Sequence, residues 1–348
     1  MKKYISLFLV LTAVASLCGC SSFRPAPQRY SKTLTEYFDT VTTVIAYDTS
    51  EAEFNRKAEE LEQWLGEYDR LYDIYQPYDG INNLYTVNEQ AGKAPVKVDR
   101  KVLDLLLYGK EAYTLSRGTV NICLGSVLRL WHEAREASLE NPESAYLPEQ
   151  AALTQASAHT DIQQLILDEQ ASTVYLADSE MSLDVGAVAK GFAARALSER
   201  IQENLWQDFV LSLGGNVCTA GNKNGDGTTL WNVQIENPNP QAGSALEVLQ
   251  LTDKAVVTSG DYQRYFTVDG MQYCHIIAPD TLYPADAFSG VTVVCEDSAL
   301  GDVLSTALFI LSLDQGKELV EALDGVEALW VDKAYNIIYS SHFEDYLK

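Results

Sequence analysis

The change in hydrophobic periodicity along the chain constrains its fold more than any other feature. In the first half, apolar residues recur at helical spacing over 54–75, directly after Ser50 and Glu53, a pair typical of a helix N-terminus. A second apolar helical face follows Asp99. From about residue 172 onward, short β-branched and aromatic runs alternate with turns. Helices followed by a run of strands are typical of the α+β class, and they argue against regular βαβ alternation and a pure sandwich.

The same patterns predict individual elements. One strand is expected over 35–48, the first helix should end before Pro77, and 82–98 should form loop and short strand. Residues 132–160 are polar, which is typical of a surface insertion of helical turns. Further elements are expected as strands at 173–178, 181–186, 208–215, 230–236, 247–251, 254–260 and 290–297, an apolar helix at 302–313, and hairpins around Asp269-Gly270 and over 328–341.

The N-terminus has the pattern of an export signal. Lys2 and Lys3 precede an apolar run that is too short to span a bilayer, and the run ends in Leu-Cys-Gly-Cys. This resembles a bacterial lipobox with Cys20 as the lipidated residue; an ordinary secretory signal cleaved near Gly19 is the alternative. The expected organisation is a lipoprotein signal at 1–20, a tether at 21–33 and one domain at 34–348. The protein is therefore expected to be exported and held by its lipid anchor alone at the outer face of the bacterial cytoplasmic membrane.

Charge and cysteine content restrict the partners. The formal net charge of −24 argues against a nucleic-acid partner, which would need clustered Lys and Arg. A bound polyanion would need local positive charge or a metal ion to offset this field. The four later cysteines, at 123, 218, 274 and 295, match no zinc spacing, so we expect buried free thiols, with one disulfide as the alternative.

The stretch LDVGAVAKG, 183–191, combines an acid with a helix start. Asp184 ends an apolar run, Gly186 opens the turn, and Lys190 lies in the first helical turn. Free N–H groups at a helix start attract anions, and a lysine adds a point charge. An ordinary strand-to-helix turn would have the same residues. The stretch is neither a Walker A loop nor a dinucleotide fingerprint.

Asp302 and Thr306 lie four residues apart in a predicted helix, so their oxygens face the same way. A carboxylate and a hydroxyl suit Mg²⁺, which keeps waters and phosphate oxygens as its other ligands. A helix cap is the alternative explanation. His275, in a strand-like run, is either a buried core histidine or a general base.

Three further segments have a composition that suits a ligand. The turn LGGN at 213–216 allows close approach of a ligand to the backbone, and TSGDY at 258–262 offers hydroxyls and a ring. Tyr75 and Tyr78 flank Pro77 and are placed to stack on an aromatic ligand or simply to pack. Together these groups suit transfer or hydrolysis at a pyrophosphate.

This set of motifs resembles the ApbE family of FAD:protein FMN transferases. The motifs are LDVGAVAKG, LSLGGN, TSGDYQRYF, HIIAP and the helix with Asp302 and Thr306, and the resemblance runs from about Tyr37 to Tyr339. It implies a single large two-lobed domain related to the T-fold. It also implies Mg²⁺-dependent transfer of FMN from FAD to a Thr or Ser hydroxyl in the flavinylation motif of an acceptor flavoprotein, with release of AMP.

The resemblance assigns roles to individual residues. Mg²⁺ would be bound by Asp302, Thr306 and the backbone carbonyl of Ala187, with Ser305 nearby, and His275 would be the base. The positions that match FAD contacts are Tyr75, Val120, Asn121, Ile122, Asp184, Lys190 and Ile276. The chain departs from the family pattern at Phe38, Asn121, Ala278 and Ser305, where methionine or acids are common.

Two other activities remain compatible with these residues. The first is an FAD pyrophosphatase that yields FMN and AMP without an acceptor. The second is a non-catalytic flavin-binding lipoprotein, although a simple binder would not need the Asp302–Thr306 pair.

Overall fold

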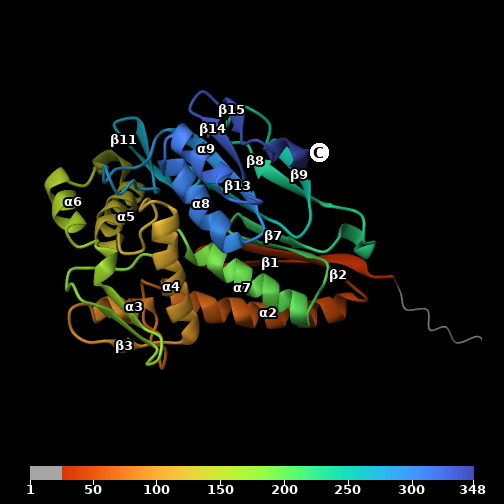
Figure 1. Ribbon diagram of the computed structural model, residues 1–348, viewed down its shortest axis with the longest axis horizontal. Helices are drawn as coiled ribbons and strands as arrows, with labels where there is room; N and C mark the ends of the chain where they lie inside the picture. Colours follow the sequence, from red (N-terminus) through yellow and green to blue (C-terminus); the bar gives the residue numbers. More distant parts are fainter. Residues whose placement is uncertain (1–25) are drawn as a thin grey trace, which may run out of the picture.

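An eight-stranded, wholly antiparallel sheet lies at the centre of the computed structural model, which describes residues 26–348 (Figure 1). Its strands, in spatial order, are β1 (Gln28–Tyr37), β2 (Thr40–Asp48), β6 (Phe209–Leu213), β7 (Asn216–Ala220), β10 (Ala255–Gly260), β13 (Phe288–Cys295), β14 (Glu327–Asp332) and β15 (Ile337–Tyr339). The predicted lipidation site, Cys20, lies outside the described residues. Across 26–348, no helix combines the length and apolarity needed to cross a membrane.

Helices cover one face of this sheet and a small second sheet covers part of the other. The covering helices are α2 (Glu51–Tyr72), α7 (Ala189–Asn204) and α8 (Ser298–Ile310), with α9 (Leu313–Glu321) packed on α8. The second sheet is β8 (Trp231–Glu236) paired with β9 (Ala245–Leu251). Val293 of β13 packs in the helix-side core and Val294 in the opposite one, so every residue of β13 is buried. The predicted α+β class is confirmed.

A helical lobe lies beside the end of the main sheet (Figure 1). It contains α3 (Leu84–Glu89), α4 (Arg100–Leu115), α5 (Gly125–Glu140), α6 (Gln150–Ser157) and a three-stranded sheet of β3 (Val96–Lys97), β5 (Thr173–Leu176) and β4 (Leu165–Asp168). The hairpin of β11 (Tyr265–Val268) and β12 (Met271–Cys274) packs on α5 through Phe266 and Trp131. A segment from the strand-rich half therefore joins the helix-rich half.

The strand predicted over 35–48 is wrong as a single element. The chain reverses at Phe38 and Asp39, which adopt φ values of 54° and 48°, and this separates β1 from β2. The Asp69 carboxylate fixes the reversal by accepting the Phe38 N–H at 2.7 Å. The predicted tether also ends too late, since β1 starts at Gln28 and pairs there with Asp48.

Helix α2 ends before Pro77 as predicted, whereas two further predictions, over 82–98 and 181–186, fail; in all three places side chains take over backbone hydrogen bonds. Helix α2 ends at Tyr72, since the Asp73 carboxylate accepts the Tyr75 N–H at 2.6 Å and turns the chain. Residues 82–98 include helix α3, whose N-cap is Asn83. The strand expected at 181–186 is an irregular segment, because Leu183 donates to the Asn88 side chain at 2.8 Å.

Other local predictions are confirmed. Asp269 and Gly270 both have positive φ, at 51° and 80°, as a type I′ turn requires. Asp99 caps α4 by accepting the Lys101 N–H at 2.8 Å. The four cysteines at 123, 218, 274 and 295 are buried free thiols.

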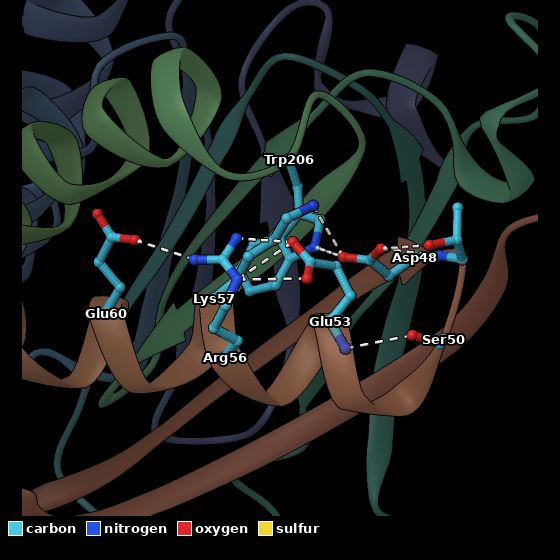
Figure 2. A network of polar contacts seen from close by, with 8 residues as sticks. Asp48, Ser50, Glu53, Arg56, Lys57, Glu60 and Trp206 are labelled. Atoms are coloured by element: carbon cyan, nitrogen blue, oxygen red, sulfur yellow. Dashed lines mark hydrogen bonds and ion pairs between the residues drawn. The ribbon is translucent and has the colours of Figure 1, made fainter.

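A buried carboxylate ties α2 to the sheet and to the end of α7 (Figure 2). Asp48 accepts hydrogen bonds from Lys57 Nζ and Trp206 Nε1, both at 2.9 Å, and from the Thr49 N–H at 2.7 Å. Burial acts to raise the pKa of Asp48, but these donors outweigh it and lower the pKa below its ordinary value. This interaction network anchors the strand-to-helix turn at Ser50.

Candidate functional site

A cavity of about 270 Å³ opens where the main sheet, the α7–α8 pair and the helical lobe meet. The predicted site residues that line it are Tyr75, Val120, Asn121, Ile122, Asp184, Ala187, Lys190, His275, Ile276, Asp302 and Thr306. The residues to which the resemblance assigns metal, base and FAD-contact roles therefore line one cavity. The segments 213–216 and 258–262 also contribute lining residues, including Gly214, Asn216 and Ser259.

The anionic partner at the N-terminus of α7 is a side chain of the protein, the Asp302 carboxylate. The Gly191 N–H donates to Asp302 Oδ2 at 2.7 Å, so a carboxylate from α8 occupies the position expected for an external anion. A Cβ at Gly191 would collide with the Asp302 Cβ and the Ser298 carbonyl, so only glycine permits this approach. Lys190 Nζ donates to the Gly186 carbonyl at 3.2 Å.

Asp302 is almost completely buried, with 5% of its surface exposed, and it lies one helical turn from Thr306. Burial raises its pKa, while Lys190, the Gly191 N–H and the Asn216 side chain oppose the rise. Ser305 is also buried, and its hydroxyl donates to the Asp302 main-chain carbonyl at 3.1 Å. The free side of the Asp302 carboxylate and the Thr306 hydroxyl are thus left facing the cavity.

The donors around Asp302 fit a hard cation. Ala187 precedes the α7 N-cap, Val188, and its carbonyl accepts no hydrogen bond from residues 26–348. Together with Asp302 and Thr306 it offers three oxygens of the kinds that Mg²⁺ binds. The described part of the chain has no cluster of three or more His, Cys, Asp or Glu side chains suited to a metal. A magnesium ion there would complete its shell with water or phosphate oxygens.

His275 follows β12 directly and its ring is oriented by one carbonyl. Nδ1 lies 3.1 Å from the Arg264 carbonyl, which assigns the proton to Nδ1 and leaves Nε2 as the acceptor. The ring retains solvent access on the cavity side, yet loss of hydration and then the charges of Lys190, Arg264 and Arg135 lower its pKa to about 4. His275 is therefore a neutral base at pH 7.

Three cations face the cavity without a carboxylate partner among residues 26–348. Lys190, Arg264 and Arg135 contact only neutral acceptors: the carbonyls of Gly186 and Asp39, and His132 Nδ1 at 3.2 Å. Arg135 Nε is buried with no partner among the described residues. In a chain with a net charge of −24, this concentrates positive charge where a pyrophosphate would bind.

Three of the residues that line the cavity were not predicted as site residues: Arg135, His132 and Arg264. Arg264 lies inside the motif TSGDYQRYF, so its neighbours were a usable signal. Arg135 and His132 had none, because α5 reads in sequence as a polar surface helix. His132 stacks on the exposed ring of Tyr75, with centroids 5.5 Å apart.

The side chains of two candidate residues, Asn121 and Tyr78, make their contacts within the protein. Asn121 uses its side chain internally, donating to the Thr160 carbonyl at 2.9 Å and accepting the Cys123 N–H at 2.9 Å. Its contribution to the cavity wall is therefore mainly backbone. The Tyr78 hydroxyl donates to Asp73 at 2.9 Å, and Tyr78 is absent from the cavity lining.

Comparison with known proteins gives a consistent result. The family model described as the ApbE family matches residues 38–330. An FAD:protein FMN transferase of Klebsiella pneumoniae is 30% identical over 280 residues, covering 78% of this chain and 84% of that protein. One from Treponema pallidum is 34% identical over 260 residues, covering 71% of this chain and 70% of that protein.

Solved structures share the fold. The crystal structure of the ApbE protein of Thermotoga maritima has a TM-score of 0.77 at 25% identity, covering 92% of this chain and all of that one. The flavin transferase ApbE of Vibrio cholerae has a TM-score of 0.78 at 22% identity over the same shares. The arrangement of sheet, helices and helical lobe is thus shared over most of the chain.

Proposed function

The chain belongs to the ApbE family, and from this premise we propose that it transfers FMN from FAD to a threonine or serine hydroxyl of an acceptor flavoprotein, releasing AMP. The observation that carries the proposal is one cavity that holds Asp302, Thr306, His275 and three unpaired cations. These are the groups that phosphoryl-type transfer needs for positioning, charge neutralisation and proton removal.

The binding of FAD follows from the charges around the cavity. Lys190, Arg135 and Arg264 offset the pyrophosphate, while Tyr75 and the 120–122 backbone line the region for the rings. Asp184 is half-buried and accepts the Gly186 N–H at 2.8 Å, and loss of hydration raises its pKa. A carboxyl group in this position suits contact with a hydrogen-bond donor of FAD rather than with its phosphates.

We propose Mg²⁺ as the cofactor, bound by Asp302, Thr306 and the Ala187 carbonyl. When bound, it would neutralise negative charge that develops on the pyrophosphate. The support is the all-oxygen donor set and the free Ala187 carbonyl. Gly191 keeps the Asp302 carboxylate oriented by its 2.7 Å hydrogen bond.

His275 removes the proton from the acceptor hydroxyl in this proposal. Its Nε2 takes the proton while the hydroxyl oxygen forms a bond to the FMN-side phosphorus. The bond between that phosphorus and the bridging oxygen breaks, and AMP leaves with the bridging oxygen. The Arg264 carbonyl holds Nδ1–H, so the acceptor nitrogen remains directed to the cavity.

We also propose export and lipid anchoring through Cys20, at the outer face of the bacterial cytoplasmic membrane. Lys2, Lys3, the apolar run and Leu-Cys-Gly-Cys support it. Labelling of cells with a palmitate analogue should mark the wild-type protein and not the Cys20→Ser variant. Labelling of both proteins would contradict the assignment.

One assay separates the three candidate activities. The protein is mixed with FAD, Mg²⁺ and an acceptor that carries an Asp-Gly-x-Thr-Gly-Ala segment, and the acceptor is weighed by mass spectrometry. An FMN adduct on the threonine supports the transferase. FMN and AMP without an adduct would indicate a pyrophosphatase instead, and tight FAD binding without turnover would indicate a simple binder.

A further inference from the structure

The β11–β12 hairpin is a two-stranded sheet with edges of its own. Its register pairs Val268 with Met271 and Phe266 with Tyr273. In a hairpin with a two-residue turn, the two residues that flank the turn form a hydrogen-bonded pair. Val268 and Met271 therefore bond to each other, and so do Phe266 and Tyr273. The residues between these pairs direct their N–H and C=O groups away from the hairpin. On β11 the outward residues are Tyr265 and Thr267.

These outward groups on β11 have no partner among the described residues. No backbone or side-chain hydrogen bond joins the main chain of Tyr265 or Thr267 to residues outside the hairpin. Both residues are exposed, Tyr265 to 41%. Phe266 and Val268 alternate with them and are buried in the α5 core, so the free edge is held on a rigid support.

The β12 edge is different. Cys274 is buried, and its thiol contacts the Ala285 carbonyl at 3.4 Å. The Gln272 side chain folds back to donate to the Asp261 carbonyl at 2.7 Å. Both outward-directed residues of β11 are exposed, whereas on β12 Gln272 is exposed and Cys274 is buried, so β11 is the more accessible edge of the hairpin.

The β11 edge leads into the cavity. Arg264, the residue before β11, and Phe266 within it both line the cavity. His275 follows β12 and bonds through its N–H to the Arg264 carbonyl at 3.1 Å. At about 3.4 Å per residue, a strand beside Thr267 reaches the level of Arg264 within about 10 Å.

We propose that the acceptor segment docks as a third strand on the β11 edge, pairing with the main chain of Tyr265 and Thr267. This rests on the proposed flavin transfer. Addition of a strand fixes an extended peptide by main-chain hydrogen bonds. A peptide bound in this way would bring to His275 a hydroxyl that lies about three residues beyond the paired stretch. Main-chain pairing would require no fixed sequence in the paired residues.

Two proline variants of the full chain test the edge. Thr267→Pro removes one outward N–H of β11, and Gln272→Pro is the matched change on β12. With a synthetic peptide containing Asp-Gly-x-Thr-Gly-Ala as acceptor, Thr267→Pro should lower kcat/KM about tenfold, mainly through KM for the peptide. Gln272→Pro and Thr267→Ala should stay close to wild type, and FAD affinity is measured in parallel to show that the cavity is intact.

A second measurement avoids any effect on folding. The wild-type protein is assayed with peptides N-methylated at single positions on one side of the acceptor threonine. Loss of peptide binding, measured by fluorescence anisotropy, at alternate positions supports strand pairing. Equal activity of Thr267→Pro and wild type, or indifference to N-methylation, would overturn the docking proposal while flavin transfer stands. Absence of any adduct with wild type would instead overturn the proposed function and this proposal with it.

Discussion

The Gly191 N–H at the start of α7 donates to the Asp302 carboxylate of α8 at 2.7 Å. This contact joins the two helices at the wall of the cavity. It orients the carboxylate of Asp302, which lies one turn from Thr306 in α8. The stability and the chemistry of the site therefore depend on one backbone contact.

Gly191→Ala should disturb both properties. The added methyl group would collide with Asp302 and the Ser298 carbonyl, so the variant should lose about 1–3 kcal/mol of unfolding free energy, measured by urea titration. Gly243→Ala, where a Cβ meets nothing nearby, is the control and should change stability by no more than about 0.5 kcal/mol. Wild-type stability in Gly191→Ala would show that α7 and α8 separate easily.

Asp302→Asn should separate stability from activity. The amide oxygen still accepts the Gly191 N–H, and because burial raises the pKa of the carboxyl, the neutral side chain should leave stability equal or higher. Mg²⁺-dependent turnover should fall at least about 100-fold. Asp314→Asn, at an exposed position of α9, is the control. Turnover at the wild-type rate would refute the metal assignment.

The pH dependence of catalysis should reflect the low pKa of His275. Since its pKa lies near 4, the neutral base persists as pH falls from 7 to about 5, and kcat/KM should decline only below that. An unperturbed histidine would already be half protonated near pH 6.5. His275→Gln should lose about 10²–10⁴-fold in rate and abolish this acid limb. An acid limb of kcat/KM with its midpoint near pH 6.5 in the wild type would contradict the low pKa of His275.

Arg135→Gln should weaken FAD binding. The variant loses one of three unpaired cations, so KM for FAD should rise about tenfold and its salt dependence should fall. The control is Arg129→Gln on the same helix, where the arginine is exposed and paired with Glu133 at 2.9 Å. Equal effects of the two changes would indicate a general charge effect.

Asp48 should contribute stability that depends on pH. Its folded pKa is below the ordinary value, so its contribution is present above the unfolded pKa, near 4, and is lost as pH falls through the folded pKa. Asp48→Ala leaves Lys57 and Trp206 unpaired and should cost about 2–4 kcal/mol at pH 7. Glu53→Gln, which breaks an exposed pair with Arg56, is the control and should change stability far less.

Local chemistry made much of the site predictable. Asp302 and Thr306 share a helix face and His275 lies in a short motif, so spacing marked them as candidates, and the resemblance to the family assigned their roles. Arg135 could not be found this way. Its helix looks like a surface helix until the β11–β12 hairpin, more than a hundred residues later, packs on α5 and encloses it.

The failures in the fold prediction have a common physical origin. Phe38 and Asp39 reverse the chain with positive φ although neither is a glycine, so composition hides the turn. At 181–186 the alternating pattern suggests a strand, but Asn88 and the Ile122 carbonyl take the hydrogen bonds of Leu183 and Asp184. In both places, contacts distant in sequence decided a conformation that local preference left open.

The early start of β1 would limit the reach of the enzyme if the proposed lipid anchor is correct. If Cys20 carries the lipid, the seven residues 21–27 are all that separates the anchor from the first strand at Gln28. Fully extended, that stretch spans at most about 30 Å. The domain would reach only a thin layer above the bilayer. Its acceptors would therefore have to be membrane-bound, or enter that layer before they are flavinylated.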